Sequence, residues 1–239
     1  MFRRITASLS LLGLVLAFAS PALAVGRFVP ADFDTIQAAI DASASGDIIT
    51  VAPGTYTENL TLKSGVDVRG REAARTLIAP ADADDPAVLA NGVDDVTFGN
   101  FTIIDAQVAV DLVDATNMEI VNTVFDTATT VALRVNFDSQ VDILNNVFVD
   151  AGVALSRATP DAQVTNSAFV GNTITITSPV GLFVDPVVNV DNCGFFDNTD
   201  LVVGGVDTGL GTDPVVGNPR FVDPDARDFH LVEASPFID

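Results

Sequence analysis

The most regular feature of the chain is an alternation of apolar and polar residues that recurs about every 22 positions. In each copy, two alternating apolar residues precede an asparagine, and another apolar residue closes the segment three positions later. The copies are VTFGNFTI (96–103), MEIVNTVF (118–125), VDILNNVF (141–148), AQVTNSAF (162–169) and VNVDNCGF (188–195). Alternation with a period of two predicts β-strands, and the fixed spacing indicates a stacked repeat.

A repeat of this length, with two or three short strands, predicts one coil of a parallel β-helix. Successive coils stack about 4.8 Å apart, so equivalent apolar side chains should form columns inside the coil. The closing apolar positions predict one such column: Ile103, Phe125, Phe148, Phe169 and Phe195.

The repeated asparagines are expected at tight bends, because asparagine adopts left-handed backbone geometry at low cost. These residues are Asn100, Asn122, Asn145, Asn166 and Asn192. Their amides should also hydrogen-bond to one another in successive coils, which would form an internal asparagine ladder.

Other apolar segments complete the coils. A second strand is expected at 108–113, 131–135, 153–156, 173–177 and 201–206, and earlier strands at 48–51, 59–62 and 66–70. The segment 71–88 between the early and regular coils is expected to be a loop insertion. The pattern therefore predicts an all-β parallel β-helix of about seven coils of roughly 22 residues.

Both ends of the repeat region carry sequences suited to covering open strand edges. Residues 34–46 predict an N-terminal capping helix, with Asp34 as N-cap, Gln37 at its third position and Gly46 at its end. Residues 213–239 are rich in proline and aspartate and predict a C-terminal cap segment. Residues 25–239 should then form one β-helix domain.

Residues 1–24 have the organisation of a secretory signal peptide. Arg3 and Arg4 precede an apolar stretch at 9–18, and residues 22–24 form an A-x-A cleavage site. The apolar stretch is shorter than the about 20 residues of a membrane-spanning helix. We expect cleavage after Ala24 and a secreted, periplasmic or cell-surface protein that does not insert into the membrane.

The chain is strongly acidic, with a formal net charge of −21. Such a surface repels nucleic acid, which binds basic patches, and also repels polyuronates unless calcium bridges them. Turn chemistry, solubility or a saline habitat explains the excess of aspartate without a metal site. We expect a monomer that does not bind nucleic acid.

Cysteine, lysine and histidine, which often act in catalysis or bind metals, occur once each in the chain. Cys193 cannot form an intrachain disulfide and is expected to be a small buried apolar residue. Lys63 lies in the first coil and His230 in the terminal segment, so neither is well placed for a base in a lateral groove.

The blocks TIQAAIDASASGDIITVAPGTYTENLTL (35–62) and NPRFVDPDARDFHLVEASPFID (218–239) resemble the beginning and end of pectin-lyase-like, right-handed parallel β-helix proteins. The closing block is similar to that of exported bacterial β-helix repeat proteins of uncharacterised function. The resemblance implies a single-stranded right-handed parallel β-helix with an N-terminal capping helix. It does not imply one activity, because that superfamily hosts many.

Enzyme signatures of that superfamily are incomplete in this chain. Residues 54–58 fit the Gly-x-Tyr-x-Glu signature of pectin methylesterases, but the blocks that carry the catalytic residues of that family are missing. Glu58 does not correspond to a catalytic carboxylate there. Residues 198–200 resemble part of a polygalacturonase motif without its glycine, and Asp197 and Asp200 are interpreted as turn residues.

Two arginines are the candidate catalytic residues if the protein is a lyase or epimerase. Lyases and epimerases use a base together with calcium or arginine to stabilise an enolate. Arg134 and Arg157 are 23 residues apart, so both could project from one face of adjacent coils and hold an anionic sugar. The simpler interpretation is that they pair with Asp111, Asp138 or Asp161.

Calcium is the cofactor to consider, because hard oxygen ligands at alternate positions suit it. The candidate ligands are Asp82, Asp84 and Asp85 in the insertion and Asp223, Asp225 and Asp228 in the terminal segment. Neither run completes a known calcium loop.

These observations favour a secreted β-helix without recognisable catalytic motifs that acts as a carbohydrate-binding or structural surface module. The expected partner is a polysaccharide or cell-surface glycan. The alternatives are a diverged polysaccharide lyase or epimerase acting on acidic polysaccharide, with calcium, and a passenger fragment of a larger surface protein. A scarcity of stacking aromatics, with no Trp and one Tyr, counts against a polysaccharide enzyme.

Overall fold

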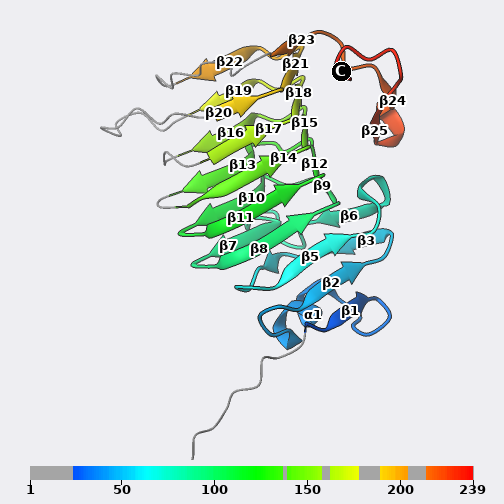
Figure 1. Cartoon of the computed structure of the whole chain (residues 1–239), viewed down its shortest axis with the longest axis vertical. Coiled ribbons are helices and arrows are strands. Elements are labelled where there is room, and N and C mark those ends of the chain that lie inside the picture. The colour runs from blue at the N-terminus through cyan, green and yellow to red at the C-terminus, as the bar shows by residue number, and fades with distance from the viewer. Residues whose placement is uncertain (1–23, 137–138, 158–161, 178–188, 204–213, 239) are drawn as a thin grey trace, which may run out of the picture.

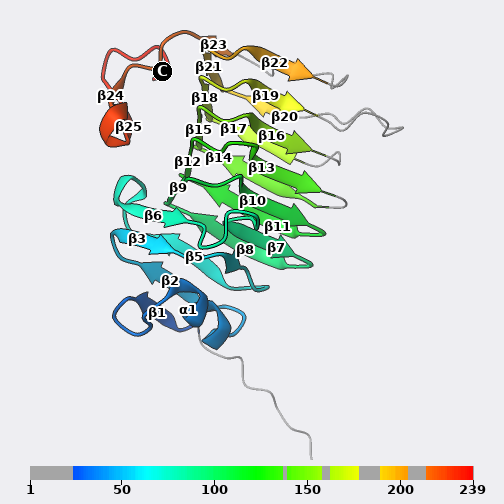
Figure 2. The same ribbon diagram turned by 180° about the vertical axis from the view of Figure 1, so that it is seen from behind.

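The protein is a right-handed parallel β-helix whose coils stack along the long axis of the molecule (Figures 1 and 2). The computed structural model describes residues 24–136, 139–157, 162–177, 189–203 and 214–238. Each coil contributes one strand to each of three parallel sheets, which confirms the predicted fold class and the number of about seven coils.

The three sheets follow one another around each coil. Sheet A contains β1 (Gly26–Val29), β2 (Ile48–Val51), β5 (Asp67–Gly70), β8 (Asp94–Gly99), β11 (Thr116–Val121), β14 (Val141–Leu144), β17 (Ala162–Thr165) and β20 (Asn189–Asp191). Sheet B contains β3 (Gly54–Thr57), β6 (Thr76–Ala79), β9 (Thr102–Ile104), β12 (Val124–Asp126), β15 (Val147–Val149), β18 (Ala168–Val170), β21 (Gly194–Phe196) and β23 (Val215–Val216). Sheet C contains β4 (Leu60–Thr61), β7 (Val88–Asn91), β10 (Val108–Val113), β13 (Val131–Asn136), β16 (Val153–Arg157), β19 (Ile174–Thr177) and β22 (Asp200–Val203).

The expected loop insertion at 71–88 is only partly a loop. It contains a 3₁₀ turn, η1 (Ala73–Arg75), and the strand β6, which pairs with β3 and β9 in sheet B. The sequence pattern did not indicate β6 because TLIA lacks the asparagine and phenylalanine of the later repeats.

The predicted phenylalanine column is confirmed. Phe125, Phe148, Phe169 and Phe195 stack face to face, with successive ring centroids 4.6, 4.8 and 5.3 Å apart. Ile103 continues the column below Phe125 in register. The distances between successive rings are close to the distance between neighbouring strands of a sheet. Each coil therefore buries its phenylalanine against the phenylalanines of the adjacent coils.

The repeated asparagines form the bends between sheets A and B, as predicted. Their φ angles are positive, from 49° at Asn122 to 62° at Asn100. A second column of left-handed residues forms the bends from sheet B to sheet C: Asp105, Thr127, Asp150, Gly171 and Asp197. Aspartate at such bends, including the predicted turn residue Asp197, accounts for part of the acidic composition. The same prediction is wrong for Asp200, which is the first residue of strand β22.

The prediction that the repeated asparagines form an internal ladder is wrong. The side chains of Asn122, Asn145, Asn166 and Asn192 are exposed. A left-handed residue turns its side chain away from the coil interior, and the next residue points inward instead.

The residues directly after these asparagines form the buried polar column. The Thr123 N–H donates to Asn146 Oδ1 at 2.8 Å, the Asn146 N–H to Ser167 Oγ at 3.1 Å, and the Ser167 N–H to Cys193 Sγ at 3.4 Å. The Asn146 amide also donates to the Ile120 carbonyl at 2.8 Å. These bonds satisfy backbone groups that the bend removes from the sheet ladders.

Cys193 ends this column among the described residues and is buried, as expected. Burial raises the pKa of its thiol to about 11. The thiol is therefore protonated at neutral pH, which removes the nucleophilic thiolate form.

The N-terminal helix is shorter than predicted and begins with a different cap. Helix α1 spans Ile36–Ala42, and its N-cap is Thr35, whose Oγ1 accepts the Ala38 N–H at 3.1 Å; Asp34 is not the cap. Gln37 does not close a capping box, because its amide bonds to the backbone of Thr61. The helix covers the first coil with its apolar face, as expected for a cap.

The Gly-x-Tyr-x-Glu signature has a structural role at this end. Both carboxylate oxygens of Glu58 accept backbone N–H groups of α1, from Ile36 and Gln37, each at 3.0 Å. Tyr56 packs against the core and donates to the Ala52 carbonyl at 2.9 Å. An anion at a helix N-terminus satisfies its free donors, so the signature fixes the cap to the first coil.

Replacement of Glu58 by alanine should lower the free energy of unfolding by about 1–2 kcal/mol, because two charge-assisted bonds to the helix are lost. Urea denaturation followed by circular dichroism measures this change. Glu72, which forms an exposed ion pair with Arg75, provides the matched control, and Glu72→Ala should have almost no effect. Equal effects of the two variants would contradict this role of Glu58.

The described part of the C-terminal segment does not lie over the end of the last coil as a cap. After β23 extends sheet B, the chain folds back along the outside of that sheet as a hairpin of β24 (Phe221–Asp223) and β25 (Asp228–Leu231), joined by the 3₁₀ turn η2 (Pro224–Ala226) (Figure 1). Arg227 reaches Asp126 on β12, with Nε 2.6 Å from Oδ2. The segment therefore covers a side of the β-helix over several coils.

Candidate functional site

The predicted residue Arg134 lies in the row of sheet C residues that aligns Asp111, Arg134 and Ser156. Its Nε is 3.3 Å from Asp111 Oδ1, which confirms one of the expected partners. Within the described residues this nitrogen makes no hydrogen bond of good geometry, so the contact is an ion pair only. Asp111 also accepts a hydrogen bond from Asn136 Nδ2 at 2.8 Å.

Asp111, the acidic partner of Arg134, is half-buried. Burial raises its pKa, while the Arg134 guanidinium and the Asn136 amide oppose the change. A carboxylate with a raised pKa beside an arginine is a feature that catalytic sites share with structural ion pairs.

The expected stacking of Arg134 and Arg157 is contradicted by the register. Arg134 aligns with Ser156, whereas Arg157 aligns with the buried Val135. The two arginines therefore occupy different positions on adjacent coils, although their sequence spacing equals one coil. The side chain of Arg157 lies outside the described residues, as do the alternative partners Asp138 and Asp161.

The first group of predicted calcium ligands is arranged as a turn. The Asp84 N–H donates to Asp82 Oδ1 at 3.0 Å, and the loop is held by Asn59, whose Nδ2 donates to the carbonyls of Asp82 and Asp85.

In the second group of predicted calcium ligands, Asp223 and Asp228 form hydrogen bonds to nearby residues. Asp223 Oδ1 accepts the Ala226 N–H at 3.2 Å, and Asp228 bonds to His230, which lowers the pKa of the Asp228 carboxyl. Asp225 is exposed. Nowhere in the described ranges do three His, Cys, Asp or Glu side chains gather as a metal site would require.

A polar groove of about 670 Å³ runs across the outer face of sheet A. Register-equivalent residues Thr97, Glu119, Asp142 and Gln163 form its central row. Its acidic character and its lack of aromatic residues make it a poor surface for stacking sugars.

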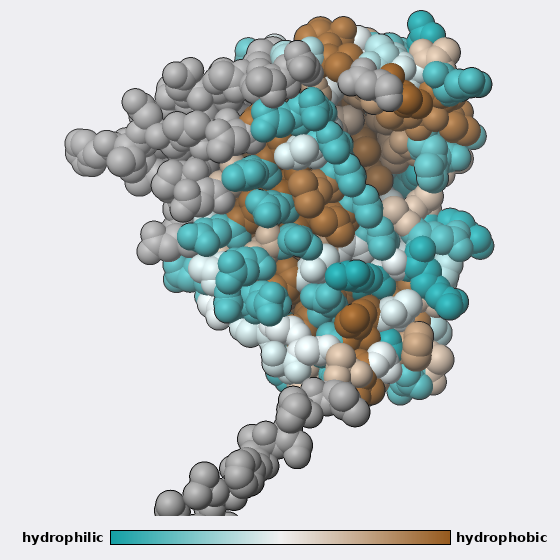
Figure 3. All heavy atoms as spheres, in the orientation of Figure 1, coloured by the Kyte–Doolittle hydropathy of each residue, from teal (hydrophilic) through white to brown (hydrophobic). Residues whose placement is uncertain are grey.

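A cleft of about 340 Å³ between sheet B and the C-terminal segment has different chemistry. One wall carries the exposed bend asparagines of three successive coils, Asn145, Asn166 and Asn192. The opposite wall carries partly exposed apolar side chains from the C-terminal segment: Phe221, Phe229, Leu231 and Phe237. In Figure 3 a brown, apolar hollow separates the body of the β-helix from this segment.

The cleft continues toward the N-terminal coils. A second hollow of about 210 Å³ shares Asn145, Val147 and Phe229 with the first and adds Asn122 and His230. The two hollows together follow four coils, or about 14 Å of the helix axis at a spacing of about 4.8 Å.

Two contacts hold the C-terminal wall in place. The first is the Arg227–Asp126 ion pair at 2.6 Å. The second is the ring of Phe237, which lies directly over Gly194: a Cβ at Gly194 would be 2.0 Å from the ring. Only glycine fits at this position, so the ring packs on bare backbone.

The sequence did not reveal this cleft. The predicted column contains only phenylalanines of the repeat, whereas Phe221, Phe229 and Phe237 lie outside the repeat. Their even spacing of eight residues in the C-terminal block was the available signal.

No protein-family model and no curated protein matches the chain. The search of solved structures finds a pectin methylesterase mutant in complex with a hexasaccharide, at 13% identity and a TM-score of 0.50, covering 88% of this chain and 99% of that one. It also finds the pectin methylesterase from Aspergillus niger (16% identity, TM-score 0.46, 83% and 75% covered). An alginate lyase from Paenibacillus is matched as well (10% identity, TM-score 0.36, 76% and 96% covered).

The first of these likenesses, at 13% identity, shows shared architecture and not shared activity. No helix in the described residues is long and apolar enough to cross a membrane. The first of these likenesses, together with the three parallel sheets, shows that the chain has the pectin-lyase-like right-handed parallel β-helix fold.

Proposed function

We propose that the protein is a secreted or cell-surface β-helix that binds glycans in the cleft between sheet B and the C-terminal segment. The observation that carries the proposal is a row of exposed asparagine amides on successive coils facing a row of phenylalanines. The protein acts as a monomeric binding module, exported by the predicted signal peptide.

The two walls supply the two kinds of contact that sugars require. Asparagine side chains offer both donors and acceptors to hydroxyl groups, and the bends repeat them about every 4.8 Å. Phenylalanine rings provide flat apolar surface for the C–H faces of a pyranose. A linear polysaccharide lying along the axis would meet an asparagine amide at each of these coils and phenylalanine rings on the opposite wall.

Charge favours a neutral ligand. The net charge of −21 repels acidic polymers, and Arg227, which lines the second hollow, is already paired with Asp126. The class of ligand that fits is therefore a neutral polysaccharide or cell-surface glycan.

The proposal predicts that Asn166→Gly raises the Kd for the glycan by up to about tenfold, because one hydrogen bond from an amide side chain is lost. Glycine keeps the left-handed backbone, so the variant removes the amide and preserves the bend. The ligand comes from an array of neutral and acidic oligosaccharides with and without calcium, and titration calorimetry measures its Kd.

The matched control is Asn117→Gly, which removes an exposed asparagine of the same left-handed geometry from the sheet A groove. It should bind as the unchanged protein does. Loss of binding in this control, with full binding by Asn166→Gly, would move the site to sheet A and contradict the proposal.

A second candidate function, a lyase or epimerase on acidic polysaccharide, is favoured by the raised pKa of Asp111 beside Arg134. In this alternative the pair would act on a uronate with calcium from solution. A lyase incubated with pectate or alginate and calcium should give unsaturated products that absorb in the ultraviolet, and Arg134→Ala should abolish them. Absence of product absorbance would eliminate the lyase.

A further inference from the structure

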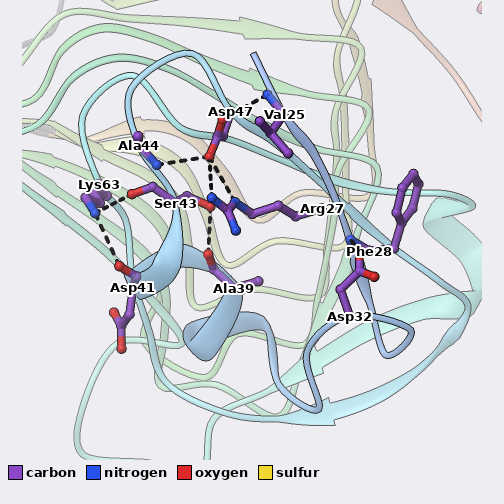
Figure 4. Close-up of polar contacts among 10 residues, drawn as sticks. All are labelled: Val25, Arg27, Phe28, Asp32, Ala39, Asp41, Ser43, Ala44, Asp47 and Lys63. Carbon is purple, nitrogen blue, oxygen red and sulfur yellow. Dashed lines mark hydrogen bonds and ion pairs between the residues drawn. The ribbon is translucent and has the colours of Figure 1, made fainter. Parts of the chain in front are cut away.

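A buried carboxylate, Asp47, joins the first strand of the protein to the end of helix α1. Asp47 is only 4% exposed. Its Oδ2 accepts Arg27 Nε at 2.9 Å and the Ala44 N–H at 3.0 Å, while its Oδ1 accepts the backbone nitrogen of Val25 at 2.9 Å (Figure 4). The backbone bonds from Ala44 and Val25, and then Arg27, hold the pKa of Asp47 below its usual range.

Val25 is the residue that directly follows the predicted signal-peptide cleavage site, and Ala24 before it is exposed. The carbonyl of Val25 accepts the Ile48 N–H at 3.2 Å, so the backbone of Val25 is fixed beside sheet A. The Val25 nitrogen is therefore held in place by the bonds of Val25 to Asp47 and Ile48.

We propose that Val25 is the mature N-terminus and that its free α-ammonium group docks on Asp47, which completes the N-terminal cap only after processing. Water hydrolyses the Ala24–Val25 peptide bond, catalysed by a signal-peptidase-type endoprotease. The Ala24 carboxylate leaves with the leader, and the Val25 nitrogen gains protons to become an ammonium group. An amide hydrogen bond to Asp47 is thereby converted into a charged one.

The geometry specifies this cleavage position. Among the described residues, Oδ1 has one hydrogen-bond partner, the Val25 nitrogen, whereas Oδ2 is shared by Arg27 and Ala44. A charged donor strengthens a hydrogen bond to a carboxylate, and the low exposure of Asp47 limits screening by water. Cleavage one residue earlier or later would move the ammonium away from Oδ1.

The surrounding charges do not compete for this position. Lys63 lies near the same helix end but donates to the carbonyls of Ser43 and Asp41 (Figure 4). The Asp67 carboxylate on the neighbouring strand β5 pairs with Arg69. Within the part of the chain that the structure describes, the charged partner of Asp47 is Arg27 on β1.

The proposal gives stability a specific dependence on pH. The α-amino group titrates at about 7.7–8.0 in an unfolded chain, and pairing with Asp47 raises that pKa in the folded protein. Its contribution is therefore complete below about pH 7.7 and is lost as the pH rises through the raised value. A rise of about one unit corresponds to a tenfold change in the unfolding equilibrium constant.

The first test is the N-terminal sequence of the protein exported from its precursor, which should begin at Val25. The second compares two purified chains, one beginning at Val25 and one at Ala24, by urea denaturation between pH 6 and 10. The chain beginning at Val25 should have an unfolding constant about tenfold lower at pH 6, and the difference should disappear near pH 10.

Asp47→Asn in both chains provides the control, because it should abolish the difference while Arg27 and Ala44 lose their partner equally in each. Should Asp47→Asn fail to fold, titration of the α-amine by competitive labelling at different pH values replaces it. That titration should show a raised pKa in the chain beginning at Val25 alone. A mature N-terminus at another residue, or identical stability of the two chains at every pH, would overturn the proposal.

Discussion

Replacement of Phe148 by alanine is expected to lower the free energy of unfolding by about 3–5 kcal/mol. Phe148 is fully buried, and its ring stacks on Phe125 at 4.6 Å and on Phe169 at 4.8 Å. The rings on both sides are fixed by their strands, so they cannot collapse into the cavity. Because neighbouring coils stabilise one another, the loss should affect the coils on both sides.

Urea denaturation followed by far-ultraviolet circular dichroism measures this effect, since the chain has no tryptophan. Phe28→Ala is the matched control, because Phe28 is 46% exposed. Its effect should be below about 1 kcal/mol. If Phe148→Ala were as mild as the control, the stacked column would not be a main source of stability.

The second large effect is expected for Asn146→Ala, which should lower the free energy of unfolding by about 2–4 kcal/mol. Asn146 is buried and bonds to the Thr123 N–H and the Ile120 carbonyl, each at 2.8 Å. Alanine would leave both backbone groups without a partner and away from water. Each such group costs about 1–3 kcal/mol.

The preceding residue provides the contrast. Asn145 is exposed, with a φ of 56°, so Asn145→Gly keeps the bend and should change stability by less than about 1 kcal/mol. The same denaturation experiment compares the two variants. A larger loss for Asn145→Gly than for Asn146→Ala would restore the asparagine ladder expected from the repeat itself.

The stacking of the fold could be predicted because it depends on periodicity alone. In a parallel β-helix, residues one period apart must lie above one another, so the spacing of Phe125, Phe148 and Phe169 fixes their contact. The bends were predictable for the same reason, because the same backbone geometry recurs with each asparagine.

The direction of individual side chains could not be read from spacing in the same way. A shift of one residue reverses the face of a strand, so Arg134 and Arg157 have the spacing of one coil without the same register. At the bends the left-handed backbone moved the interior position from Asn145 to Asn146.

The cleft was unpredictable because it depends on contacts between distant segments. Arg227 and Asp126 are 101 residues apart, and no periodic pattern relates them. The C-terminal block was interpreted as an end cap from its composition, whereas its hairpin packs along sheet B. The resulting hollow places phenylalanines from outside the repeat beside asparagines from within it.

Hydroxyl-radical footprinting with the best glycan from the array tests the proposed site most directly, because it reports which side chains the ligand covers. The account predicts that saturating glycan reduces oxidation of Phe221, Phe229 and Phe237, while Phe28 at the N-terminal end stays unchanged. Unchanged oxidation of the three cleft phenylalanines at saturation would contradict glycan binding in this cleft.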